Sequence, residues 1–284
     1  MQHVVMFSGG AASYVAAKRV IEKYGRENVT LLFADTRTED ETLYEFVAQA
    51  EKALGLKVTI PVPQARYVEV KDIWDVFFGE RMIAHNGIGV CTKNLKQIPC
   101  DNWIKRNFPN PDDVTIWVGI DMWEQHRLIG SEKKQGLAKK KLPYIYKSPL
   151  FEKPYLVKKD MLNICLADGL DIPELYTLGF EHNNCGGFCV KAGKGHFKNL
   201  LKTKRSRYLY HERREQEFRE FIGKDVSILT DQIRIPGEKK YRKETLTLKQ
   251  FRERIESQGE GLLQIDFEDS GGGGCGCFSD GQED

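Results

Sequence analysis

A short run of serine and glycine residues near the N-terminus has the composition of an anion-binding loop. Ser8, Gly9 and Gly10 directly follow an apolar segment, and Ser13 lies three residues beyond Gly10. Glycines let a backbone approach a phosphate closely, and a helix that begins here adds N–H groups and partial positive charge. The serine hydroxyls can donate further hydrogen bonds. We therefore predict a phosphate-binding loop, with an ordinary strand-to-helix junction as the alternative.

Two charged residues further along the chain are spaced to act together. Glu124 and Arg127 are three residues apart, so on a helix they share one face and can meet one substrate. The alternative is an ion pair on the helix surface. The two residues follow a predicted strand, and open α/β sheets bind ligands at the carboxyl ends of their strands. We therefore favour a pair that faces a substrate.

The seven cysteines are the third group of residues whose side chains can carry out chemistry. In a reducing compartment they are read as metal ligands, reactive thiols or core residues before disulfides. Cys100 and Cys165 lie in apolar helical settings and are predicted to be core residues. Cys275 and Cys277 follow four consecutive glycines, in a tail that has no capacity to form a core.

Alternating strands and helices must position these residues over the first 120 residues. Apolar runs predict strands, and apolar residues recurring every three or four positions predict helices. The strands are expected at 3–7, 29–34, 58–62 and 113–120, and the helices at 11–24, 41–54, 71–78 and 93–108. Strands that alternate with helices indicate a parallel sheet covered on both faces.

The second half of the chain is predicted to be mainly helical. Helices are expected at 158–167, 196–221 and 247–257, with a short strand at 225–230. We predict an α/β fold with a parallel sheet of about five strands, helices on both faces and a mainly helical C-terminal region. The expected divisions are an α/β nucleotide-binding domain at 1–150, a helical region at 151–269 and a flexible tail at 270–284.

Composition excludes several classes of protein. Hydrophobic residues make up 40% of the 284 positions, which is enough for a sizeable core and too many for a disordered chain. The formal net charge of +2 gives no overall signal for nucleic-acid binding. No apolar stretch approaches the roughly 18 residues of a transmembrane helix, and the N-terminus lacks the pattern of a signal peptide. We expect a cytoplasmic protein without a membrane segment.

The serine and glycine run resembles the S-G-G-x-x-S loop of the PP-loop ATP pyrophosphatases, also called adenine nucleotide α-hydrolases. This resemblance implies that the loop binds the pyrophosphate of ATP. Many members carry a lysine and an aspartate inside the loop, where this chain has Ala11 and Ala12. The missing positive charge would then come from elsewhere, for example from Lys18 or from Mg²⁺.

Two further segments extend the resemblance. Asp35 ends the second predicted strand, where members carry an aspartate near the nucleotide, and the segment from Gly119 to Arg127 resembles their G-I-x-x-x-E-x-x-R motif. The implied nucleotide site comprises Ser8, Gly9, Gly10, Ser13, Asp35 and Gly119.

Segments that contain cysteine, and one that precedes a cysteine pair, narrow the resemblance to one group of enzymes within this superfamily. Residues 91–99 resemble the C-x-x-x-x-K-x-x-P segment of phosphoadenylyl-sulfate (PAPS) and adenylyl-sulfate (APS) reductases. Residues 174–180 resemble their P-L-Y-x-x-G segment, and a cysteine pair follows it. The chain therefore resembles a PAPS reductase-like subfamily of bacteria and phages, which implies a PP-loop, HUP-like fold.

The resemblance also implies a metal centre. Members that carry an iron–sulfur cluster use four cysteines, and three here match in position: Cys91, Cys185 and Cys189. The fourth ligand would come from Cys275 or Cys277 on the tail or from His182, or the fourth iron position would be open to substrate. We expect a [4Fe–4S] cluster, with zinc as the less favoured metal and no metal as the other alternative.

The function implied by the resemblance is adenylation of a substrate by ATP with release of pyrophosphate, followed by sulfur transfer to a nucleic acid or a small molecule. Asp35, Glu124 and Arg127 would serve the reaction, with ATP and Mg²⁺ as cofactors. One alternative is a PAPS or APS reductase with Cys275 or Cys277 as nucleophile. Another is a non-catalytic nucleotide-binding module with a structural metal site. We also expect a sulfur-donor or electron-donor protein as partner, and a homo-oligomer.

Overall fold

The computed structural model describes residues 1–83, 89–131, 135–234 and 241–257 of the chain. The predicted tail at 270–284, with Cys275 and Cys277, lies outside the described residues.

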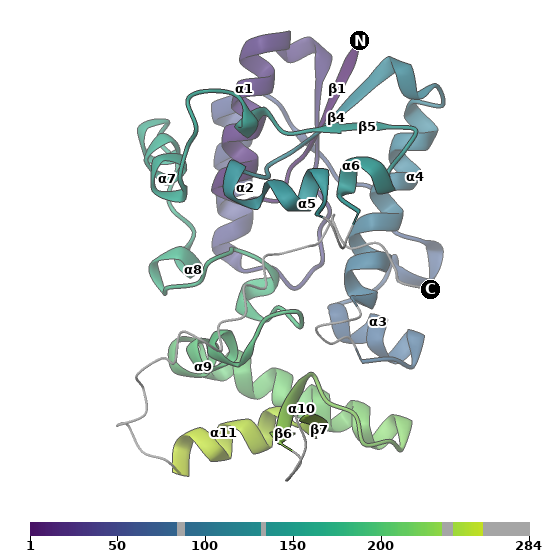
Figure 1. Ribbon diagram of the computed structural model, residues 1–284, viewed down its shortest axis with the longest axis vertical. Helices are drawn as coiled ribbons and strands as arrows, with labels where there is room; N and C mark the ends of the chain where they lie inside the picture. Colours follow the sequence, from purple (N-terminus) through teal and green to yellow (C-terminus); the bar gives the residue numbers. More distant parts are fainter. Residues whose placement is uncertain (84–88, 132–134, 235–240, 258–284) are drawn as a thin grey trace.

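A five-stranded parallel sheet forms the N-terminal half (Figure 1), which confirms the predicted fold class. The strand order is β3-β2-β1-β4-β5. The strands are β1 (Gln2–Met6), β2 (Val29–Leu32), β3 (Val58–Thr59), β4 (Val114–Val118) and β5 (Ile145–Lys147). β1 is central and pairs with β2 on one side and β4 on the other, with Val4 opposite both Thr30 and Ile116.

Both faces of the sheet are covered because both sets of alternating side chains in its strands are apolar. Val5 and Phe7 pack with α1 (Ala11–Tyr24), α2 (Glu41–Leu54) and α7 (Lys158–Ala167). Val4 and Met6 pack on the other face, with α4 (Ile98–Asn107), α5 (Gln125–Ile129) and α6 (Leu137–Lys140). Cys165 belongs to the first core and Cys100 to the second, both fully buried, so their prediction as core residues is confirmed.

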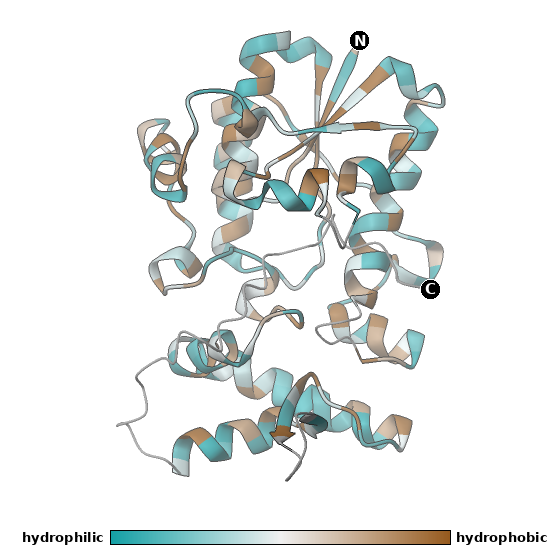
Figure 2. Cartoon of the chain, viewed as in Figure 1, coloured by the Kyte–Doolittle hydropathy of each residue, from teal (hydrophilic) through white to brown (hydrophobic). Residues whose placement is uncertain are grey.

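A third core joins the C-terminal elements to α3 (Ile73–Glu80), and these elements lie below the sheet in Figure 1. The elements are α8 (Glu174–Thr177), α9 (Lys194–Thr203), α10 (Arg205–Ile222), α11 (Leu248–Ser257) and the antiparallel hairpin of β6 (Leu229–Arg234) and β7 (Tyr241–Leu246). Figure 2 shows the same helices with brown stretches among teal ones, as expected for helices with one buried face.

The C-terminal region differs in detail from what the sequence predicted. The single helix expected at 196–221 is divided into α9 and α10 at Lys204, whose backbone is not helical (φ −132°, ψ 57°). Its side chain reaches away to Asp40 and Glu174, at 2.7 Å from each carboxylate. β7 was not predicted, because its charged sequence, YRKETL, lacks a clear apolar alternation.

Short helical turns connect the main elements. They are η1 (Arg26–Asn28), η2 (Ala65–Tyr67), the π-helix η3 (Thr92–Gln97), η4 (Pro111–Asp113), η5 (Met122–Glu124), η6 (Pro149–Phe151) and η7 (Cys185–Gly187). Within the described ranges, no helix has the length and apolar character needed to cross a membrane.

A buried carboxylate holds the C-terminal region together. Glu215 on α10 is 1% exposed and accepts hydrogen bonds from the backbone N–H groups of Ile228 (2.9 Å) and Leu248 (2.6 Å). Burial raises the pKa of Glu215 to about 7, because the loss of water outweighs the two N–H donors.

This raised pKa predicts a pH-dependent stability. A carboxyl group whose pKa rises from 4.5 in the unfolded chain to about 7 in the folded protein favours folding fully below pH 4.5. That contribution, on the order of 3 kcal/mol, is lost as the pH rises through 7. The measurement is urea denaturation between pH 4 and 8. Glu215→Gln should lack this part of the pH dependence, and parallel curves for the two proteins would contradict the assignment.

Candidate functional site

A pocket opens at the carboxyl ends of β1 and β4, the two adjacent strands at which the chain order of the sheet reverses. Open α/β sheets bind their ligands at this point. The walls come from the β1–α1 junction, the segment after β4, and residues between α7 and η7. The lining residues used below are Ser8, Gly10, Ser13, Lys96, Gly119, Asp121, Glu124, Arg127, Lys158, Tyr176, His182, Asn183 and Asn184.

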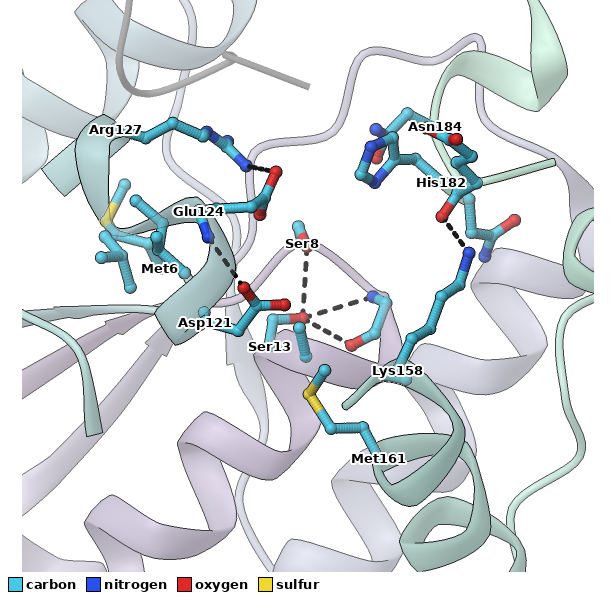
Figure 3. Close-up of a pocket in the computed structure, with 18 of the residues that line it drawn as sticks. Met6, Ser8, Ser13, Asp121, Glu124, Arg127, Lys158, Met161, His182 and Asn184 are labelled. Atoms are coloured by element: carbon cyan, nitrogen blue, oxygen red, sulfur yellow. Dashed lines mark hydrogen bonds and ion pairs between the residues drawn. The ribbon is translucent and has the colours of Figure 1, made fainter. Parts of the chain in front are cut away.

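The base of the pocket is the predicted phosphate loop (Figure 3). The Ser13 hydroxyl donates to the carbonyl of Gly10 at 2.8 Å and accepts from the Gly10 N–H at 3.2 Å. Ser8 donates to the same hydroxyl at 3.2 Å. The loop therefore leads into the N-terminus of α1, where unpaired backbone N–H groups favour an anion.

Two glycines of this region are required by close packing. Gly9 has φ +74°, and a Cβ there would lie 2.8 Å from the Leu43 side chain. A Cβ on Gly119 would lie 2.9 Å from the backbone of Ala12 and Ser13. Because backbone atoms cannot move aside easily, the end of β4 can approach the first turn of α1 only if residue 119 is a glycine.

The segment after β4 forms one side of the pocket. The Asp121 carboxylate accepts from the N–H groups of Trp123 (2.9 Å) and Glu124 (3.0 Å), which fixes the start of η5. Glu124 and Arg127 form an ion pair at 2.6 Å. Both line the pocket, with side chains 29% and 17% exposed, so the pair is not on the open surface.

The opposite side of the pocket comes from the C-terminal region, and Figure 3 shows Lys158, His182 and Asn184 there. The Lys158 amine donates to the carbonyl of Glu181 and lies 4.9 Å from the centroid of the Tyr176 ring. The Tyr176 hydroxyl oxygen accepts from the N–H of Ala11 at the start of α1. Burial raises the pKa of Tyr176 to about 12 and lowers the pKa of Lys158 and of His182.

The positive charge missing from Ala11 and Ala12 is not supplied by Lys18. That amine pairs with Asp168 at 2.6 Å and does not line the pocket. The Tyr14 hydroxyl donates to the same carboxylate at 2.8 Å, so Lys18 links α1 to the end of α7. The cations that line the pocket are Lys96, Lys158 and Arg127.

Lys96 belongs to a buried ion pair at the pocket wall. Its amine lies 3.4 Å from the Glu39 carboxylate, and the two side chains are 7% and 2% exposed. Glu39 also accepts from the Thr36 hydroxyl at 2.8 Å and from the N–H of Cys185. Burial opposes the charge on Lys96, but Glu39 outweighs it and raises the pKa of Lys96. The amine is therefore a permanent cation.

Three cysteines predicted as metal ligands lie close enough to influence one another electrostatically. Burial raises the pKa of Cys91 to about 11 and also raises the pKa of Cys185 and Cys189. The thiols are therefore protonated at neutral pH. No group of three or more His, Cys, Asp or Glu side chains within the described ranges is arranged to hold a metal ion.

The remaining predicted residues divide into two groups. Gly119 lines the pocket with the loop residues. Asp35 does not; its carboxylate accepts from the N–H of Arg37 and the hydroxyl of Tyr44, both at 2.7 Å. Cys275 and Cys277 lie outside the described residues, so their roles remain predictions.

Comparison with protein families gives one match. Residues 2–119 match the model of the phosphoadenosine phosphosulfate reductase domain. This part of the chain is similar to that domain. The matched residues include the predicted phosphate loop, Lys96 and Gly119, whereas the opposite wall of the pocket lies beyond the match.

Among solved structures, the chain is similar to a phosphoadenylyl-sulfate reductase from Candida auris, determined as a phosphate complex. The identity is 14% and the TM-score 0.45, and the match covers 65% of this chain and 81% of the other. That similarity is too low to carry an argument about function. No curated protein matches the chain.

Several residues in and around the pocket had no role predicted from the sequence. Lys96 lies in the quoted C-x-x-x-x-K-x-x-P segment, which was a usable signal. Glu39, Lys158 and Asn183 had no such signal, because long-range packing alone brings them to this place.

The buried pair predicts a large effect on stability. Lys96→Met leaves the Glu39 carboxylate buried without its cation, so the free energy of unfolding should fall by about 3–5 kcal/mol in urea denaturation. The matched control is Lys23→Met, because Lys23 pairs with Glu152 at 2.7 Å on the surface. The control should leave stability nearly unchanged. Equal effects of the two substitutions would contradict the importance of the buried pair.

Proposed function

We propose that this protein binds ATP in the pocket and uses it to adenylate a substrate for sulfur transfer, with release of pyrophosphate. One observation carries the proposal: the N-terminus of α1 opens into a pocket that is also lined by Lys96, Lys158 and Arg127. A helix N-terminus with cations beside it favours a polyanion such as a nucleoside triphosphate, and the acidic residues of the same lining, among them Asp121, leave room for a Mg²⁺ ion that accompanies the phosphates.

The reaction follows from the charges around the pocket. Ser8, Gly10 and Ser13 hold the phosphates, and the lining cations replace the charge that the loop lacks. A substrate oxygen attacks the α-phosphorus of ATP, the bond to the bridging β-phosphate oxygen breaks, and pyrophosphate leaves. Glu124, which forms an ion pair with Arg127, accepts the proton of the attacking hydroxyl. A sulfur nucleophile then displaces AMP.

Asp121 would hold Mg²⁺, since this ion is usually bound by one or two carboxylates together with substrate phosphates. When bound, it would neutralise charge on the phosphates. An iron–sulfur cluster has less support. Because the described residues do not gather three ligands, no reaction step is assigned to a cluster.

A second candidate is a reductase of PAPS or APS, which the family match of residues 2–119 favours. A thiolate attacks the sulfur of the sulfonucleotide, the sulfur–oxygen bond to the phosphate breaks, and the nucleotide leaves. A second thiol then releases sulfite and forms a disulfide, which a dithiol donor protein reduces. The protonated thiols of Cys185 and Cys189, whose pKa values are raised, are poor nucleophiles, so Cys275 or Cys277 would attack.

The experiment that tests the first candidate is ATP binding and pyrophosphate release. Gly10→Val should abolish ATP binding, because a Cβ on Gly10 already lies 3.0 Å from the Tyr176 hydroxyl and the added methyls fill the anion site. The matched control is Gly79→Ala, whose Cβ meets nothing closer than 3.8 Å.

Unchanged ATP affinity in Gly10→Val would overturn the phosphate loop. Sulfite release from PAPS or APS without pyrophosphate release from ATP would favour the reductase. Nucleotide binding without either product would indicate a non-catalytic module.

The metal prediction has a separate test. Anaerobic purification should yield about four iron and four sulfide per chain if a [4Fe–4S] cluster is present. We expect Cys185→Ala and Cys189→Ala to lose this metal and Cys100→Ala to keep it, because Cys100 lies in the core of the sheet. Metal retained in both Cys185→Ala and Cys189→Ala would contradict the assignment of these cysteines as ligands. Zinc in place of iron would indicate a structural site.

A further inference from the structure

One buried side chain in the pocket wall has no partner within the part of the chain that the structure describes. Asn183 is 2% exposed, and neither its Nδ2 nor its Oδ1 makes a hydrogen bond there. Leaving a buried donor and acceptor unpaired is unfavourable, because each group has lost its hydrogen bonds to water. An unpaired buried amide indicates that a bound molecule makes the missing hydrogen bonds.

The surroundings of Asn183 hold this amide in place. It lines the same pocket as the phosphate loop, between His182 and Asn184. The backbone on one side is fixed by Lys158, which donates to the carbonyl of Glu181. The backbone on the other side is fixed by Glu39, which accepts from the N–H of Cys185. The backbone on both sides of Asn183 is therefore held in place, and its side chain is buried in the pocket wall.

The chemistry of the missing partner follows from the two atoms. Oδ1 accepts a hydrogen bond and Nδ2 donates one, so the partner must present a donor beside an acceptor. A phosphate or sulfate presents acceptors only and would leave Oδ1 unpaired. The amino group and adjacent ring nitrogen of adenine match an asparagine amide in this way. Cytosine presents the same arrangement with its amino group and N3.

We propose that Asn183 is a specificity residue that binds the amino-bearing edge of a nucleobase, while the phosphate loop binds phosphate. This inference rests on the nucleotide site proposed above. The base belongs either to the nucleotide itself or to a second substrate, and the chemistry at Asn183 is the same for both.

The test is equilibrium binding to the full chain of three ligand pairs: ATP and ITP, adenosine and inosine, and cytidine and uridine. In each pair the second member replaces the amino group by an oxo group. Wild type should prefer the amino-bearing member by roughly 10- to 100-fold in at least one pair. Preference in the adenine pairs assigns the base to the nucleotide, and preference only in the cytidine pair assigns it to a second substrate.

Asn183→Leu should bring that preference close to parity. It should not lower the stability of the ligand-free protein, because an apolar side chain of similar size removes two unpaired polar groups. The matched control is Asn94→Leu. Asn94 is also buried, at 3% exposed, but its amide donates to the Val90 carbonyl at 3.0 Å and to Glu80 at 3.3 Å. The control should lower stability and keep the preference.

Three results would overturn the inference. The first is no preference in any pair for wild type. The second is a preference that survives in Asn183→Leu. The third is a loss of stability in Asn183→Leu with ligand preference unchanged, which would mean that water alone completes the amide. The proposed function can fail separately from this inference. If nucleosides bind through Asn183 but Gly10→Val leaves the ATP affinity unchanged, the inference stands and the assignment of the phosphate loop is wrong.

Discussion

The site depends on the contact between the end of β4 and the first turn of α1. The missing side chain at Gly119 allows this contact, because a Cβ there would lie 2.9 Å from the α1 backbone. Since β1 and β4 are neighbours in the sheet, the same contact brings the phosphate loop beside the segment that carries Glu124 and Arg127. A larger residue at this position would separate the two sides before any substrate arrived.

A buried ion pair joins this pocket to the C-terminal region. Glu39 follows β2, Lys96 lies on η3, and Cys185 begins η7, yet all three meet within one hydrogen-bonded cluster. Burying these two charges would be unfavourable without the neighbouring hydrogen bonds, since each charge has lost most of its hydration. Its amine therefore combines two roles, because it neutralises a structural carboxylate and contributes positive potential to the pocket.

The sequence was sufficient for the features that depend on local pattern. Apolar runs indicated four strands of the sheet, and the serine and glycine residues predicted as a phosphate loop do line the pocket. It was insufficient where distant segments decide the outcome. Lys18 is near the loop in sequence, but its partner is Asp168 on another helix. Asn183 has no motif of its own, and only the folded chain shows that it is buried without a partner.

The two walls of the pocket come from different parts of the chain. The predicted phosphate loop and Gly119 lie within residues 2–119, which match the phosphoadenosine phosphosulfate reductase domain, whereas Lys158, Tyr176 and Asn183 lie beyond residue 119. Substitutions in the second wall can therefore change which molecule fits the pocket without altering the loop that forms the first wall.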